Sequence, residues 1–188
     1  MRGVLLAITL TTGLGGPVVA ADAQGRYAVE GTGRLICKDM VAASGNVQTM
    51  RDLAAWMTGY MTAHNRLVPD TFDLTPWQTP GAQVFLVNQY CQSNPEDTVE
   101  QAAKNLVAFL VDDRLVTAST PVSQGVGSQI TLIYPEVMEQ AISALVEAGH
   151  TPSSGNEGLA AAIRAYQADV GITQSGLFDQ STLARLFE

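Results

Sequence analysis

The sequence predicts an all-α protein in which a signal peptide precedes two small helical domains joined by a flexible linker. Of its 188 residues, 46% are hydrophobic and 15% are charged, a composition typical of a folded globular protein. Apolar residues recur at helical spacing in two stretches, and an uncharged segment rich in Ser, Thr and Gly separates them. We expect a signal peptide at 1–23, a first domain at 31–115, a linker at 116–129 and a second domain at 130–188.

The first residues have the features of a secretory signal peptide. Arg2 supplies a basic start, 4–14 is apolar, and a Gly-Gly-Pro sequence at 15–17 leads into a run of small residues. Cleavage is expected after Ala20 or Ala23, which would place the mature protein in the periplasm. No apolar run reaches the ~20 residues that a helix needs to span a bilayer, so we expect no membrane span.

Cys37 and Cys91 are the only cysteines of the chain. An oxidising compartment favours a disulfide between them. In the chain-entropy model, closing this loop would contribute roughly 4 kcal/mol to stability. A metal site is the competing interpretation, but neither cysteine has a nearby Cys/His cluster that could complete a tetrahedral ligand set. We expect the disulfide, and neither a metal nor a cofactor.

The first domain begins, after a polar arm, with a long helix at about 50–66. Its apolar face includes Trp56, Tyr60 and His64 at i, i+4 spacing, so this face is expected to be buried. A loop at 70–81 follows, because three of its residues are proline or tryptophan in a polar context that breaks the helical period.

A second helix is expected at about 82–92, where Cys91 shares a face with valines. The third helix should start at Asn94 and Pro95, since asparagine caps free N–H groups and proline suits the first helical position. It fades at 112–114, ahead of the expected linker.

Short helical patterns fill the second domain. The first apolar stripe runs from Val137 to Leu145 and stops at Gly149, a residue suited to the left-handed position after a helix. Asn156 is expected to cap the next helix, and Asp179 to cap the last.

The segment from Tyr166-Gln167 through Gly171, Gly176 and Asp179 to Thr182-Leu183 resembles the peptidoglycan-binding domain family over about 135–187. The resemblance implies a three-helix fold and binding to the cell wall. One departure concerns the binding face: the family usually has an Asp-Gly-x-x-Gly segment between its first two helices, where this chain has Ser-Ser-Gly-Asn-Glu-Gly at 153–158.

The candidate ligand-binding residues are uncharged polar side chains near the turn that follows the second helix of this domain. Their amides and hydroxyls suit the hydroxyl and amide groups of a glycan or peptide. They are Gln167, Gln174, Ser175 and Gln180.

The first domain is similar, over about 31–111, to the HdeA/HdeB periplasmic acid-stress family, and less so to the Tai-type immunity family. The similarity rests on Cys37, Trp56, Gly59-Tyr60, Cys91 and Asn94-Pro95. It implies a disulfide-bonded helical fold. The Tai-type family usually has further cysteines, which this chain lacks.

A catalytic constellation is not evident, so we expect a protein that is not an enzyme. The chain has His64 and His150 as its only histidines, and it contains no HExxH, Gly-x-Ser-x-Gly or P-loop motif. His64 on an aromatic helix face and His150 after a helix-ending glycine both have structural explanations.

The formal net charge of -8 argues against nucleic acid as a partner, because an acidic surface repels phosphate. The favoured hypothesis is a non-enzymatic periplasmic protein that binds peptidoglycan through its second domain. The alternatives are an acid-stress chaperone of HdeA type, whose partners would be periplasmic client proteins, and an immunity or interaction protein.

Overall fold

The computed structural model describes residues 21–187, so most of the expected signal peptide, 1–20, lies outside the described residues. The described chain is mostly helical but contains a small antiparallel sheet, so the prediction of an all-α fold is correct only in its main feature. None of the described helices is long and apolar enough to cross a membrane.

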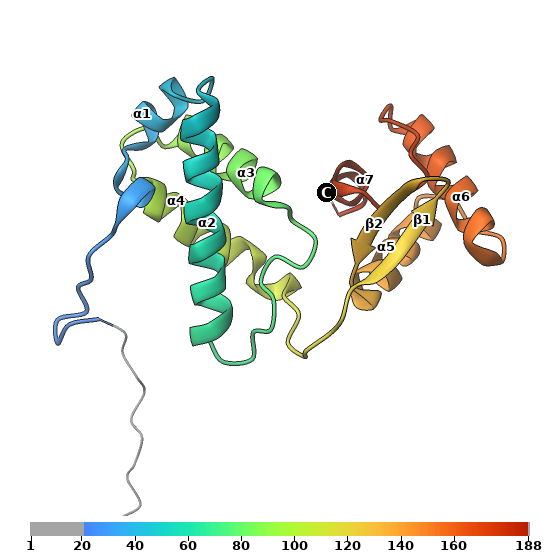
Figure 1. Ribbon diagram of the computed structural model, residues 1–188, viewed down its shortest axis with the longest axis horizontal. Coiled ribbons are helices and arrows are strands. Elements are labelled where there is room, and N and C mark those ends of the chain that lie inside the picture. The colour runs from blue at the N-terminus through green and yellow to red at the C-terminus, as the bar shows by residue number, and fades with distance from the viewer. Residues whose placement is uncertain (1–20, 188) are drawn as a thin grey trace, which may run out of the picture.

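The elements follow one another along the chain as shown in Figure 1. In order they are η1 (Gly31–Arg34), α1 (Cys37–Ala42), α2 (Val47–Leu67), α3 (Pro80–Ser93), α4 (Val99–Leu110), η2 (Val111–Asp113), β1 (Val122–Val126), β2 (Gln129–Ile133), α5 (Pro135–Glu147), α6 (Gly155–Asp169) and α7 (Gln180–Leu186).

Helices α1 to α4 enclose the first of two hydrophobic cores, which we call the N-terminal core. The long helix predicted at 50–66 is α2, and its Leu53, Met57 and Met61 are buried there as the periodicity requires. Asn46 caps α2 by accepting hydrogen bonds from the backbone N–H groups of Gln48 and Thr49.

The disulfide between Cys37 and Cys91 is present and joins α1 to α3 inside the N-terminal core. The two Cα atoms are 4.7 Å apart, and both side chains are fully buried. The bridge therefore ties the short first α-helix to α3.

The start of α4 differs from the expectation. Thr98 rather than Asn94 caps this helix, through a reciprocal capping box with Gln101. Asn94 instead closes α3, where its side-chain amide donates to the carbonyl of Tyr90 at 2.9 Å. The Asn-Pro signal is thus wrong by one turn, because a Thr-x-x-Gln box downstream satisfies more of the free N–H groups.

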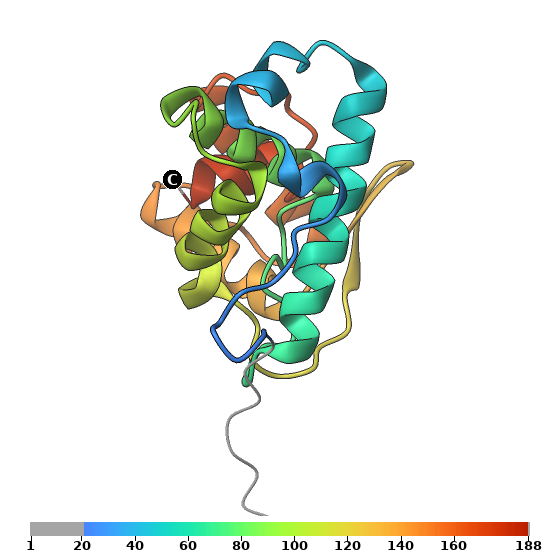
Figure 2. The same cartoon turned by 90° about the vertical axis from the view of Figure 1, so that its left-hand side faces the viewer.

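The arm at 21–34 lies across the N-terminal core (Figure 2). Tyr27 donates to the Oε1 of the buried Glu100 at 2.6 Å, and the indole of Trp56 donates to the carbonyl of Glu30 at 2.9 Å. Gly33 packs directly under the ring of Trp56. This part of the chain is therefore held by specific contacts rather than loose.

The segment expected as a structureless linker, 116–129, contains β1. This strand pairs antiparallel with β2 across the turn at Gly127 and Ser128, with Val122 opposite Ile133. The alternation was hard to see in the sequence because both faces are largely exposed and only Ile133 enters a core. The chain between the two helical groups is therefore a hairpin for most of its length.

Helices α5, α6 and α7 and the end of β2 enclose the C-terminal core. Gly149 follows α5 with a φ of 91°, as predicted for a left-handed residue after a helix. Asp179 caps α7 as predicted, but Asn156 does not cap α6: the N-cap position belongs to Ser154, because Gly155 adopts a φ of 84° and turns the chain into the helix.

The loop at 68–79 joins α2 to α3 and packs against the second group of helices. Trp77 packs against the C-terminal core, and its ring centroid lies 5.4 Å from that of Phe187. The backbone N–H of Thr79 donates to Gln180 Oε1 at 2.7 Å. A side chain from the first half of the sequence thus completes the core of the second half.

Candidate functional site

Gln167 lies at the centre of a buried hydrogen-bond network in the turn between α6 and α7. Its Nε2 is 2.7 Å from Thr182 Oγ1 and 2.9 Å from Ser175 Oγ, and its Oε1 accepts from the backbone N–H of Gly176 at 2.9 Å. The side chain is 0% exposed. The expectation that Gln167 offers surface groups to a ligand is therefore wrong: it holds the turn in shape.

Ser175 and Asp179 extend this network. Ser175 donates to Asp179 Oδ2 at 2.6 Å, and Asp179 Oδ1 accepts from Ser181 and from both the backbone and the hydroxyl of Thr182. Burial on its own raises the pKa of Asp179, but these hydrogen bonds to the ionised form outweigh it and hold the pKa below its ordinary value. The carboxylate is thus a fixed structural anion.

The other predicted residues are not brought together with Gln167. Gln174 is exposed on the turn, whereas Gln180 is half-buried and its Oε1 accepts the hydrogen bond from Thr79. The structure therefore brings the half-buried Ser175 together with the buried Gln167, leaves Gln174 on the surface and directs Gln180 toward the first half of the chain.

An uncharged hollow lies beside this turn, between β1, α5 and α6. It has a volume of about 100 Å³ and is lined by amides and a hydroxyl over an apolar floor, from Ser123, Gln124, Gly125, Val126, Met138, Asn156 and Leu159. Gln124 also accepts a hydrogen bond from the backbone N–H of Phe178 at 2.8 Å, which joins the hollow to the turn. We call this surface the polar hollow.

Sequence reasoning missed the polar hollow because two of its polar residues, Ser123 and Gln124, lie in the segment expected to be a linker. The weak alternation at 122–126 was the only available signal. The sequence predicts Asn156 as a helix cap, whereas the structure places it on the surface of the polar hollow.

A larger cleft lies between the two groups of helices. It has a volume of about 610 Å³ and is lined by aromatic and aliphatic side chains from α3, α4, α7 and the loop before α3, namely Trp77, Phe85, Leu86, Phe109, Leu110 and Phe187. Gln78, Gln89, Gln140, Gln180 and Asp113 are its main polar lining residues. We call it the aromatic cleft.

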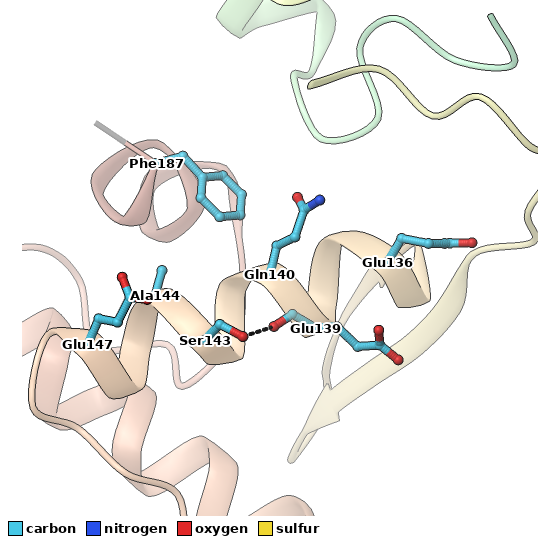
Figure 3. Close-up of a pocket in the computed structure, with 7 residues that line it drawn as sticks. All are labelled: Glu136, Glu139, Gln140, Ser143, Ala144, Glu147 and Phe187. Carbon is cyan, nitrogen blue, oxygen red and sulfur yellow. Dashed lines mark hydrogen bonds between the residues drawn. The ribbon is translucent and has the colours of Figure 1, made fainter. Parts of the chain in front are cut away.

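A shallow acidic groove of about 600 Å³ runs along α5 and meets the aromatic cleft at Gln140 and Phe187, which line both. Figure 3 shows Glu136, Glu139 and Glu147 spaced along the helix, with the ring of Phe187 over the side that carries Gln140 and Ala144. The two surfaces are therefore continuous. The groove along α5 is acidic, and the aromatic cleft is mainly apolar.

Both histidines, His64 and His150, are partly buried against neighbouring side chains. His64 is half-buried with no hydrogen-bond partner for its buried Nε2, and burial, aided by the charge of Arg114, lowers the pKa of its imidazole. His150 lies edge-on to the ring of Tyr166, with its Nε2 3.3 Å from Asp169 Oδ2.

Tyr60 is the most strongly perturbed phenol. Burial, together with the charge of the nearby Glu100, raises the pKa of Tyr60 to about 12. Its hydroxyl therefore stays protonated through the physiological range and contributes as a neutral polar group.

Within residues 21–187, no group of three or more His, Cys, Asp or Glu side chains is arranged to hold a metal ion. No family model, curated protein or solved structure matches the chain.

Proposed function

We propose that the chain is a non-enzymatic periplasmic protein of two small helical domains, and that the C-terminal domain binds peptidoglycan. The division into domains is supported by the two hydrophobic cores, each built from consecutive helices. The assignment to the wall is supported by the resemblance of about 135–187 to the peptidoglycan-binding domain family.

The observation that carries this proposal is the Gln167 network. The residues on which the resemblance rests, Gln167, Gly176, Asp179 and Thr182, bond to one another and hold the turn rigidly. A rigid turn fixes the neighbouring surface before a ligand arrives, which lowers the entropy lost on binding.

The polar hollow is the surface that best fits a glycan. Its amide and hydroxyl groups can donate to and accept from sugar hydroxyls, while Met138 and Leu159 offer an apolar floor to a sugar ring. No carboxylate lines it among the described residues, whereas the carboxylates of α5 would repel the acidic stem peptides of the wall.

Retention on purified sacculi tests the proposal. The full chain should be pelleted with sacculi, and Ser123→Ala combined with Asn156→Ala should weaken its affinity for sacculi at least roughly fivefold, as expected for the loss of two hydrogen bonds of about 0.5–1.5 kcal/mol each. Gln92→Ala, which removes an exposed amide at the end of α3, is the control and should bind like the unmodified chain.

The two parts of the proposal fail separately. A full chain that stays in the supernatant means that it is not a wall-binding protein. A double variant that is retained as well as the unmodified chain means that the wall is bound elsewhere than in the polar hollow.

An acid-stress chaperone of HdeA type is the second candidate, and the exposed Phe85 and Phe109 favour it. Met57 and Met61 are buried and would add to this apolar surface only if the helices loosened in acid. The test is whether the full chain, at about pH 3, keeps an acid-labile enzyme from aggregating. Aggregation at the same rate with and without the chain would exclude this activity.

A further inference from the structure

We propose that the aromatic cleft and the acidic groove together form a docking site for a basic, apolar segment of a partner protein. The occupant is a peptide in which lysine or arginine side chains flank leucine or phenylalanine side chains. This site is distinct from the polar hollow, so the proposal goes beyond wall binding and does not depend on it.

The apolar part of the site combines two aromatic side chains that lie outside both cores with two that pack at the edge of the C-terminal core. Phe85 on α3 is 59% exposed and Phe109 on α4 is 72% exposed, and neither packs in the N-terminal core. Trp77 and Phe187 line the same cleft and face it from the C-terminal core. Large aromatic side chains converging on a cleft of this size are typical of a protein-binding surface.

Phe109 also lies off the buried stripe of α4, which runs through Val99, Ala103, Leu106 and Leu110. A phenylalanine on the solvent side of an amphipathic helix is not needed for folding. Together with Phe85 and Trp77, which line the same cleft, it forms a contiguous exposed apolar patch of the kind that marks interaction surfaces.

The charge around the cleft selects a basic occupant. Asp113 lines the cleft, Glu136, Glu139 and Glu147 line the adjoining groove, and no lysine, arginine or histidine is among the described residues that line either. Ser119 donates to Glu136 Oε2, so this carboxylate is also held in place. Such a field attracts cations and repels acidic chains.

A buried hydrogen-bond acceptor in the cleft wall also favours an occupant that carries N–H donors. Gln78 lines the cleft, is 4% exposed, and has a side-chain oxygen with no hydrogen-bond partner. An unpaired buried acceptor is unfavourable, and a rotation of this amide toward a donor in the cleft would relieve it. Lysine, arginine and backbone N–H groups are such donors.

A second copy of the chain is a poor occupant by the same reasoning. The chain has 18 acidic and 10 basic residues, so two copies joined at this face would bring like charges together. A basic partner instead gains from both the charge and the apolar surface.

Binding of a short fluorescein-labelled peptide of alternating lysine, leucine and phenylalanine to the full chain tests the proposal, by fluorescence anisotropy at low and high salt. Phe85→Ser and Phe109→Ser should each weaken binding roughly tenfold, because each removes an aromatic contact. Glu139→Gln combined with Glu147→Gln should weaken it by roughly threefold at low salt, and less at high salt.

The controls match these changes away from the site. Ile130→Ser replaces an apolar side chain of the hairpin that is as exposed as Phe109, and Glu157→Gln removes one exposed carboxylate from α6. Both should bind the probe like the unmodified chain. Because Phe85 and Phe109 are exposed, their serine variants should keep the circular dichroism spectrum and the thermal midpoint, and they should bind sacculi normally.

Several results would overturn the proposal. They are equal binding of a peptide with glutamates in place of the lysines, full binding by both serine variants, and tighter binding of a synthetic peptide of residues 1–20 than of the basic probe. A dimer in analytical ultracentrifugation that Phe109→Ser dissociates would assign the surface to a second copy instead.

Discussion

At the scale of single residues, Asp179 has the clearest dual role. It caps α7 by accepting from the backbone N–H of Thr182 at 3.0 Å, and it accepts from the hydroxyls of Ser175, Ser181 and Thr182. All these partners are donors, so the arrangement favours the ionised carboxylate. The start of the last helix therefore depends on the charge of one side chain.

Because the pKa of Asp179 is lower in the folded chain than its ordinary value of 3.8, its contribution to stability is fully present above about pH 4 and is lost as the pH falls through the folded pKa. We expect Asp179→Ala to lower the free energy of unfolding at pH 7 by about 1 kcal/mol. Asp179→Asn should be milder at pH 7, since asparagine also caps helices, and its stability should vary less with pH than that of the unmodified chain.

Trp77 fluorescence in a Trp56→Phe background reports the unfolding of the C-terminal core, because Trp77 packs there. Urea titrations at pH 7 and at about pH 3 would measure both variants. A pH dependence in Asp179→Asn as steep as in the unmodified chain would show that this carboxylate is not the group responsible.

Gln167 shows why the sequence could not locate the site residue by residue. An amide near a turn can hydrogen-bond to a ligand, and it can equally complete a buried network, and the residue type is the same in both cases. Gln167 completes a buried network because the folded chain brings its amide against Thr182, Ser175 and Gly176. The cap at Asp179 was predictable because capping depends on neighbours in sequence.

At the scale of elements, η1 packs against α2 at Gly33, which lies against the ring of Trp56. A methyl group on Gly33 would lie 2.2 Å from Cζ2 of Trp56 and 2.8 Å from a methyl carbon of Val29. Glycine is therefore required where the arm crosses the indole ring, and any larger residue must displace that ring or the arm itself.

We expect Gly33→Ala to lower the free energy of unfolding by about 1–3 kcal/mol, as typical for overpacking, and to shift the emission of Trp56. The matched control is Gly59→Ala in the middle of α2, where an added methyl group meets nothing within 4 Å. It should raise the free energy of unfolding by about 0.5–1 kcal/mol. Equal effects of both alanines in urea unfolding would contradict this account of η1.

Elements with strong local signals were predicted well and those with weak signals were not. The wide apolar face of α2 is buried as expected, and α3 lies close to the expected 82–92, although Pro80, which starts it, was assigned to the preceding loop. The hairpin was missed because it is short, largely exposed on both faces, and stabilised by the contact of Gln124 with Phe178 far along the chain. Pairing at that separation has no local signature.

At the scale of the whole molecule, the two tryptophans report different cores. Trp56 packs against the N-terminal core and Trp77 against the C-terminal core. The disulfide ties only the N-terminal core, since both cysteines lie in it. Reduction should therefore act on one half of the molecule more than on the other.

With a reductant present, we expect the urea midpoint reported by Trp56 in Trp77→Phe to fall strongly. Loss of the disulfide lowers the free energy of unfolding by up to roughly 4 kcal/mol in the chain-entropy model. The midpoint reported by Trp77 in Trp56→Phe should fall much less. Cys37→Ser combined with Cys91→Ser should make both midpoints insensitive to the reductant. Equal falls at both tryptophans would mean that the cores unfold as one unit, against the two-domain proposal.

The two-core organisation and the disulfide were accessible to sequence reasoning, because each depends on periodicity or on cysteine number. The aromatic cleft was not, since it depends on how the loop with Trp77 brings α3 and α4 against the end of α7. The position of Phe109 off the buried stripe was its one signal in the sequence.

The hairpin turn also gives experimenters a place to attach a reporter. Gly127 and Ser128 are both exposed, and the space around Gly127 is open. Loop tips of this kind accept inserted segments because no buried backbone is disturbed. An epitope or a fluorophore introduced there would allow the molecule to be imaged inside living cells with both ends of the chain unmodified.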